Sequence, residues 1–194
     1  ILINQGLQRH GGDLAIGAYG IVNRISFVFV MIVMGLNQGM QPIAGYNFGA
    51  REFQRVDRVL KLTIFCATAI MTLGFLVAEL FPRQLVMIFT TDEELIQHSI
   101  SGMRIVFMMF PIIGFQMVTS NFFQSVGMAG KAIFLSLTRQ LLFLLPCLLI
   151  LPDFFQTNGI WMSMPVADAL SSIVSFFMLY SQIRKFKTAE QYGN

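Results

Sequence analysis

Five stretches of this chain are so long and so apolar that they constrain its fold more than any other feature. They cover residues 14–41, 59–81, 94–123, 132–151 and 159–180. Each is close to or above the ~20 residues with which an α-helix crosses the hydrocarbon core of a bilayer. Soluble helices have one apolar face, whereas several of these stretches are apolar all round. Only 12% of the residues are charged, against about 25% in soluble domains. The sequence therefore predicts an all-α integral membrane protein with five transmembrane helices.

Capping and helix-breaking residues separate these stretches. Gly11-Gly12-Asp13 predicts a turn before the first stretch, with Asp13 as N-cap, and Pro82 is expected to stop the second. Residues 91–94 predict an N-cap and an acidic first turn for the third stretch, in which Pro111 predicts a kink. Pro152-Asp153 is expected to end the fourth. Residues 1–10 are typical of the tail of a further helix, so we expect a fragment with an N-terminal stub.

Positive charge is concentrated in every second connection between the stretches. Five crossings place these connections on two sides of a membrane. One side carries eight basic residues and the other only two: Arg51, Arg55, Arg58, Lys61, Lys131, Arg184, Lys185 and Lys187 against Arg9 and Arg83. Because cytoplasmic loops are enriched in Lys and Arg, the first side and the C-terminus are predicted to be cytoplasmic.

A segment rich in glycine and amides joins the first apolar stretch to the first basic one. Residues 35–51 read G-x-x-Q-G-x-Q-P-x-x-G-Y-N-x-G-A-R. Pro42 removes a backbone donor, and Gly45 and Gly49 tolerate backbone angles that other residues resist. We therefore expect an elbow within this segment, where one membrane helix ends and a basic helix begins. The defining residues of the pattern are Gln41, Pro42, Gly45, Tyr46, Asn47, Gly49 and Ala50.

This pattern resembles the signature of the multidrug and toxic compound extrusion (MATE) family, in particular its bacterial MepA-like branch. Weaker matches at residues 18–25, 159–161 and 165–168 extend the resemblance over nearly the whole chain. It implies that residues 1–194 form the C-terminal helical bundle, the second half of a twelve-helix, inverted-V transporter. The two halves of such a transporter would rock about a central cavity. The implied location is a bacterial cytoplasmic (inner) membrane, crossed several times.

The same resemblance implies secondary active efflux of drugs or organic cations by antiport with H⁺ or Na⁺. The implied partners are membrane lipid, small organic cations and the missing N-terminal half, with no cofactor beyond the coupling ion. Some members of the family bind sodium through carboxylates. The third stretch has no Asp or Glu after Glu94, which argues against a sodium site in this half.

Amide, methionine and aromatic side chains share one face of the first apolar stretch at three- and four-residue steps. They are Asn23, Phe27, Met31, Met34, Gln38 and Gln41. Polarisable walls with a few hydrogen-bonding groups suit varied organic cations. Gln116 and Gln140, in the third and fourth stretches, are further candidates for a substrate or ion pathway. The alternative for each of these residues is ordinary helix packing, with the amides bonded to neighbouring helices.

Asp168 lies about nine residues into the last stretch, near mid-membrane, and no Lys or Arg lies within two turns of it. A polar group is costly at this depth, so it should face protein or water. A carboxyl in this place can exchange a proton, or bind a cation when it is ionised. The alternative is a hydrogen-bonded Asp168 that ties helices together. Arg139 is expected to extend its guanidinium toward the cytoplasmic surface instead.

The sequence contains no motif that indicates an enzymatic or a nucleic-acid-binding function. H-E-x-x-H, G-x-S-x-G, Walker and C-x-x-C patterns are absent. Cys66 and Cys147 lie inside apolar stretches and fit neither a disulfide framework nor a metal site. A transporter that is not an enzyme is the favoured hypothesis. A lipid-linked oligosaccharide flippase of the same superfamily, which would need a cationic cavity, and a non-transporting membrane scaffold, which would not need Asp168, remain as alternatives.

Overall fold

The computed structural model describes residues 2–192, and every regular element in this part of the chain is helical. The predicted all-α class is therefore confirmed. The elements are α1 (Leu2–Gly49), α2 (Phe53–Leu80), α3 (Pro82–Met87), α4 (Glu93–Phe107), α5 (Phe110–Ser125), α6 (Ala129–Leu137), a π-helix (Thr138–Leu144) and α7 (Leu145–Tyr192). The side chains of Arg9 and Lys187, which the charge count included, lie outside the described ones.

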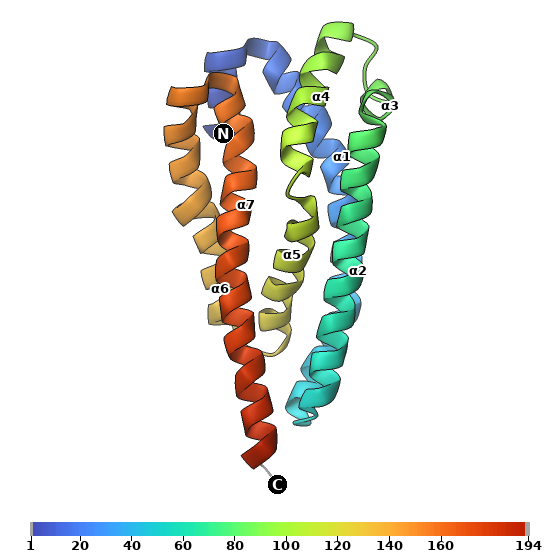
Figure 1. Cartoon of the computed structure of the whole chain (residues 1–194), viewed down its shortest axis with the longest axis vertical. Coiled ribbons are helices and arrows are strands. Elements are labelled where there is room, and N and C mark those ends of the chain that lie inside the picture. The colour runs from blue at the N-terminus through green and yellow to red at the C-terminus, as the bar shows by residue number, and fades with distance from the viewer. Residues whose placement is uncertain (1, 193–194) are drawn as a thin grey trace.

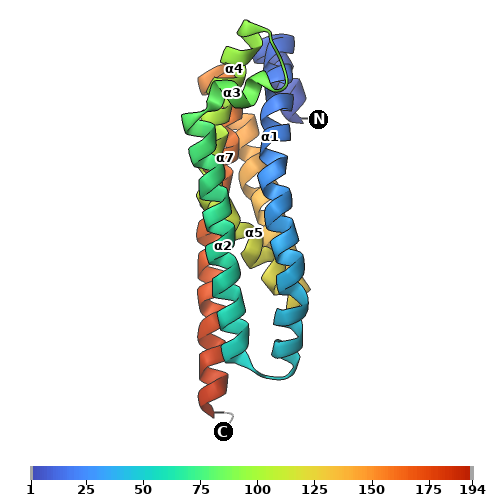
Figure 2. The same ribbon diagram turned by 90° about the vertical axis from the view of Figure 1, so that its right-hand side faces the viewer.

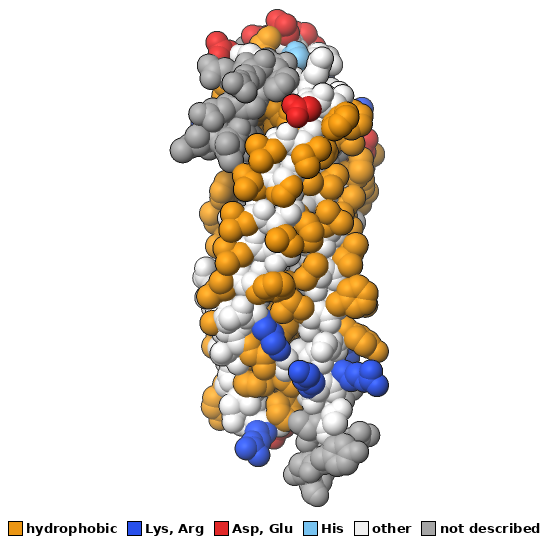
Figure 3. All heavy atoms as spheres, turned by 90° about the vertical axis from the view of Figure 1, so that its left-hand side faces the viewer, with side chains coloured by type: hydrophobic (Ala, Val, Ile, Leu, Met, Phe, Trp, Pro, Cys, Tyr) orange, Lys and Arg blue, Asp and Glu red, His pale blue; other side chains and the backbone are white. Residues whose placement is uncertain are grey.

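The helices form an elongated bundle whose long axis follows α1, α2 and α7 (Figures 1 and 2). The α1–α2 turn and the C-terminus lie at one end, which we call the basic end. The segment α3, the start of α4 and the break within α7 lie at the other end, which we call the acidic end. Figure 3 shows apolar side chains over the middle of one face, with Lys and Arg toward the basic end and Asp and Glu at the acidic end. This distribution fits a bundle that stands across a membrane.

Within the described part of the chain, three helical segments are long and apolar enough to cross a membrane. They are Gly12–Gly49, Phe53–Leu80 and Ala129–Phe186. Helices α4 and α5 pass the same test as a bent pair, which would give a fourth span. The third segment reverses its direction at Gln156 (φ 51°, ψ −130°), so that α6 and the last part of α7 lie as antiparallel arms (Figure 1).

Two predicted helix boundaries are wrong. Pro152-Asp153 was expected to end a helix, yet both residues lie within α7 and the reversal comes at Gln156. The first apolar stretch was expected to end at Gln41, yet α1 includes Pro42 and continues to Gly49. Proline carries a helical φ of its own and costs a helix one donor, so it does not have to mark the end. The turn after α1 uses Arg51, whose φ is 60°.

Other predicted boundaries are confirmed. The side chain of Asp92 accepts hydrogen bonds from the backbone N–H groups of Glu94 (2.9 Å) and Leu95 (3.3 Å), which makes it the N-cap of α4. The kink near Pro111 separates α4 from α5 by 53°. Proline fits the first turn of α5 because the donor that it lacks would have no intrahelical partner there. A break also occurs at Gly12, where φ is 65°.

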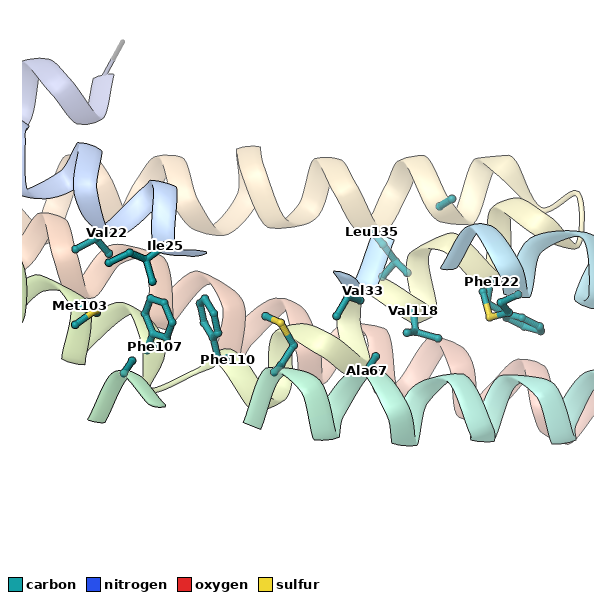
Figure 4. Packing of buried hydrophobic residues seen from close by; sticks show 14 of the residues in the cluster. Val22, Ile25, Val33, Ala67, Met103, Phe107, Phe110, Val118, Phe122 and Leu135 are labelled. Carbon is teal, nitrogen blue, oxygen red and sulfur yellow. The ribbon is translucent and has the colours of Figure 1, made fainter. Parts of the chain in front are cut away.

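The core runs along the bundle axis and fixes α5 between α1 and α2. The rings of Phe107 and Phe110 stack with centroids 3.8 Å apart at the α4–α5 bend, where they face Ile25 of α1 (Figure 4). Close approach between α4 and α7 requires Gly102, because a Cβ there would lie 2.6 Å from the ring of Trp161. These contacts position the middle of α5, which carries three of the polar side chains described below.

Candidate functional site

A polar pocket of about 180 Å³ lies where α5 faces α6 and the π-helix. Its polar lining comes from two sides: Gln116, Ser120 and Asn121 from α5, and Ser136, Arg139 and Gln140 from α6 and the π-helix. Apolar side chains of Ile113, Met117 and Leu135 complete it. The sequence predicted Gln116 and Gln140 as candidates in two separate stretches. The structure brings Gln116 and Gln140 to the same pocket.

A partly buried ion pair adjoins this pocket. The Nε of Arg139 lies 2.6 Å from Oδ1 of Asp168 in α7. The side chain of Asp168 is only 5% exposed, whereas that of Arg139 is 43% exposed and lines the pocket. The prediction that Asp168 has no basic neighbour and that Arg139 extends to the membrane surface is therefore wrong. It considered neighbours along one helix, and the partner lies on the other arm of the hairpin.

The π-helix that carries Arg139 has a cause in the sequence. It ends at Leu144, two residues before Pro146. The ring of Pro146 would clash with the carbonyl of Leu142 in a regular α-helix, and its nitrogen cannot donate. In the π-helix the hydrogen bonds span five residues instead of four, as in the bond from the Leu145 N–H to the Gln140 carbonyl. The wider turn changes the direction of the side chains before the proline. π-helical turns of this kind are frequent at functional sites.

Two further hydrogen bonds link the pocket to other helices. The side-chain amide of Gln116, itself buried, donates to the hydroxyl of Ser171 in α7. The amide of Gln41 at the end of α1 donates to Oδ1 of Asn121 at 3.3 Å. Of the predicted residues, Gln41, Gln116, Gln140 and Asp168 thus belong to one connected polar cluster, which spans α1, α5, the π-helix and α7.

The rest of the predicted face of α1 lies elsewhere. Asn23, Met31, Met34 and Gln38 are exposed, with Met31 at 55% and Met34 at 43%, and none of them lines the polar pocket. The structure therefore separates the candidates into a polar cluster within the bundle and an exposed stripe on the outside of α1. Gln41, which is half-buried, is the point where the two groups meet.

Sequence reasoning missed Asn37. Its side chain is 2% exposed, and neither amide atom has a hydrogen-bond partner among the described residues. Buried polar groups without partners are rare and costly. Asn37 lies one residue before Gln38 but on the buried face of α1, with Val33 and Met40. The sequence carried a signal for this residue, because the helical spacing of Asn37 from Val33 and Met40 places an amide on an otherwise apolar face.

The residues of the elbow pattern contribute packing and a turn. A Cβ at Gly45 would lie 2.9 Å from the carbonyl oxygen of Ser125, so glycine lets α1 approach the end of α5. The carbonyl oxygen of buried Asn47 accepts a hydrogen bond from the N–H of Glu52 at 2.9 Å, which fixes the turn. Tyr46 is 78% exposed. Pro42, Gly49 and Ala50 are exposed as well.

The chemistry available to the polar cluster is that of ion pairing and hydrogen bonding. Within the described residues no group of three or more His, Cys, Asp or Glu side chains could hold a metal ion. The pocket offers amides and hydroxyls, and a guanidinium that Asp168 neutralises. Long apolar helices that enclose such a cluster define a helical membrane protein.

Comparison with known sequences gives the family. Residues 5–149 match the family described as MatE. The chain belongs to the MatE family. Among curated relatives, the multidrug export protein MepA of Staphylococcus aureus (strain NCTC 8325 / PS 47) is 25% identical over 179 residues. The MepA of Staphylococcus haemolyticus (strain JCSC1435) is 23% identical over 170 residues. The matches cover 88% of this chain but only 38% and 37% of those proteins.

Solved structures agree with this assignment. The MATE multidrug transporter DinF-BH, solved in complex with R6G, is 41% identical to this chain, with a TM-score of 0.79 over 90% of it. A MATE structure in the bent conformation has a TM-score of 0.90 over 97% of the chain at 20% identity, which shows the shared fold. The matches cover 39% and 42% of those chains. The chain thus spans less than half the length of the relatives that it matches.

Proposed function

We propose that this chain is the C-terminal half of a secondary active exporter that exchanges drugs or organic cations for an inward coupling ion, H⁺ or Na⁺. In this proposal α1 and α2 each cross the membrane once, and the bent pair α4–α5 crosses it once. Each of the two arms of the α6–α7 hairpin adds one crossing, which gives five. The observation that carries this proposal is the Arg139–Asp168 pair beside a polar pocket. Buried charges within membrane spans are costly and mark ion or substrate pathways.

The pair gives Asp168 a means of responding to what enters the pocket. A carboxylate that is held by a guanidinium can release it in two ways: by accepting a proton, or by pairing with another cation. Either event frees Arg139, which already faces the pocket. Because proton and cation would compete for the same carboxylate, occupancy by one disfavours the other. That competition is the requirement for exchange.

The cargo and location follow from several observations together. The pocket presents amides and hydroxyls, and the exposed stripe of α1 adds Met31 and Met34, which suit varied organic cations. The relatives carry the name multidrug export protein. The location would be a bacterial cytoplasmic membrane with the basic end inside, and the remaining half of the transporter would cover the exposed stripe. A flippase for phosphate-bearing lipids gains no support, because Arg139 is the one cation among the described residues that line the pocket, and Asp168 neutralises it.

Cation efflux from proteoliposomes under an imposed H⁺ or Na⁺ gradient tests this proposal in the full-length protein. Asp168→Asn keeps the shape but removes the titrating group, and we expect it to insert normally and lose gradient-driven export. Loss of a charge-assisted contact of about 1.5–3 kcal/mol corresponds to roughly a ten- to hundredfold loss of affinity. Glu93→Gln is the matched control, since it removes the carboxylate of the exposed Arg83–Glu93 pair. Undiminished export by Asp168→Asn would refute the proposed role of this residue.

A further inference from the structure

A second groove lies at the basic end of the bundle, away from the polar pocket. It has a volume of about 350 Å³ and lies between the start of α2 and the end of α7. Its apolar wall consists of Phe53, Ile183 and Phe186, and the rings of Phe53 and Phe186 stack with centroids 5.2 Å apart. The polar wall comes from one face of α2, namely Gln54, Asp57, Arg58 and Lys61. The proposed transport mechanism uses none of these residues.

The groove carries an unbalanced positive charge. Lys61 is neutralised by Asp57, whose carboxylate oxygen lies 2.6 Å from Nζ. Arg58 is exposed and pairs with no acidic side chain among the described residues, since nearby Glu52 contacts Arg55 instead. The neighbours of Ile183 along α7, Arg184 and Lys185, are basic and exposed as well. A ligand of this groove should therefore be an anion.

A further, apolar groove continues from the charged groove along the same face of α2 toward the acidic end. It has a volume of about 390 Å³ and is lined by Phe65, Thr68, Ala69, Thr72, Leu73 and Leu76. These residues follow Arg58 and Lys61 at three- and four-residue steps, so both grooves lie on one side of the helix. The hydroxyl of Thr72 donates to the carbonyl of Thr68 at 2.7 Å, which leaves the surface largely apolar. From Phe65 to Leu76 the helix rises about 16 Å, comparable to half of the ~30 Å hydrocarbon core of a bilayer.

We infer that this face of α2 binds an anionic phospholipid, with its phosphate at Arg58 and an acyl chain along residues 65–76. Basic pockets between membrane helices are a recognised setting for anionic lipid headgroups. A soluble phosphate compound would need the charged groove alone. The apolar groove in line with it favours a molecule with a charged head and a long hydrocarbon tail. This site is independent of the proposed transport, because it shares no residue with the polar cluster.

Native mass spectrometry of the full-length protein in detergent, titrated with phosphatidylglycerol or phosphatidylcholine, tests this site. We expect phosphatidylglycerol to bind preferentially. Arg58→Gln should weaken that binding about fivefold, since a cation near an anionic lipid contributes about 1 kcal/mol. Arg55→Gln is the matched control, because it removes the same charge one turn away, outside the lining of the groove.

Two comparisons separate a lipid from other anions. Glycerol phosphate, which has the headgroup without the chains, should not displace phosphatidylglycerol at equal concentration, and Phe65→Ala should weaken binding of long-chain lipid. Displacement by glycerol phosphate would overturn the lipid assignment in favour of a soluble anion. Equal effects of Arg55→Gln and Arg58→Gln, or equal binding of both lipids, would overturn the site itself.

Discussion

At the scale of single residues, Asp168 and Arg139 differ in how they tolerate the loss of their partner. Asp168 is nearly buried, while the guanidinium of Arg139 reaches the pocket and can be hydrated there. Removing Arg139 leaves a buried charge without compensation, which is the more costly of the two defects. The asymmetry makes the pair testable by stability as well as by transport.

We expect Arg139→Gln to lower the unfolding temperature in detergent more than Asp168→Asn does. The double variant Arg139→Gln/Asp168→Asn should recover part of the loss, because a neutral amide pair leaves no buried charge. The expected difference between the Arg139→Gln variant and the double variant is about 1–3 kcal/mol. Thermal unfolding of the three variants beside the wild type measures it. Additive losses would mean that the two residues do not interact.

The ion pair also shows where sequence reasoning reached its limit at this scale. The residue types, the depth of Asp168 and the polar faces with Gln116 and Gln140 were all readable from the chain. The pairing was not recognised, although Arg139 and Asp168 lie at similar distances on either side of the Pro152-Asp153 segment. Two arms of a hairpin bring such positions together. The π-helix then decides which side chain of the first arm faces the second, and its register depends on how the chain relieves the clash at Pro146.

At the scale of helices, glycine decides how closely α4 and α7 approach. Gly102→Ala would place a Cβ 2.6 Å from the Trp161 ring, so either the ring or α4 must shift. Overpacking of this kind costs about 1–3 kcal/mol. Gly20→Ala is the matched control, since nothing lies within 4 Å of a Cβ there, and alanine in an open helical position stabilises by up to about 1 kcal/mol. We expect Gly102→Ala to lower the unfolding temperature and Gly20→Ala to raise it slightly. Equal shifts would show that the contact with Trp161 does not limit the packing.

The sequence predicted those helix boundaries that depend on nearby residues of the chain. It did not predict the boundaries that depend on contacts with other helices. The N-cap at Asp92 and the bend before Pro111 follow from side-chain and proline chemistry within one turn. The ends at Gly49 and Gln156 depend on what the neighbouring helices allow. The close approach at Gly45 supports the last turns of α1 against α5, so the helix continues through Pro42. No local pattern contains that contact.

At the scale of the whole molecule, charge separates the two ends. Arg51, Arg55, Arg58 and Lys61 cluster around the α1–α2 turn, while Asp92, Glu93 and Glu94 open α4 at the opposite end. The one described basic side chain between α2 and α4, Arg83 of α3, is held by Glu93 through two hydrogen bonds of 2.9 and 2.8 Å. Among the described side chains of the segments that connect the spans, the basic residues without an acidic partner therefore lie at the basic end. The retention of Lys and Arg on the cytoplasmic side predicts that this end faces inward.

Cysteine labelling of the full-length protein in intact cells tests this orientation. Cys66 and Cys147 are first replaced, and a single cysteine is introduced as Gln54→Cys at the basic end or Glu94→Cys at the acidic end. Both positions are exposed in the bundle, so the membrane alone should decide their reactivity. We expect an impermeant thiol reagent to label Glu94→Cys in intact cells and to label Gln54→Cys only after the membrane is opened. A positive-inside orientation requires that contrast. The free energy needed to move several cations across the bilayer is larger than the stabilisation that any single helix contact contributes. Labelling of Gln54→Cys from outside would reverse the topology, and with it the direction in which Arg139 and Asp168 could move a cation.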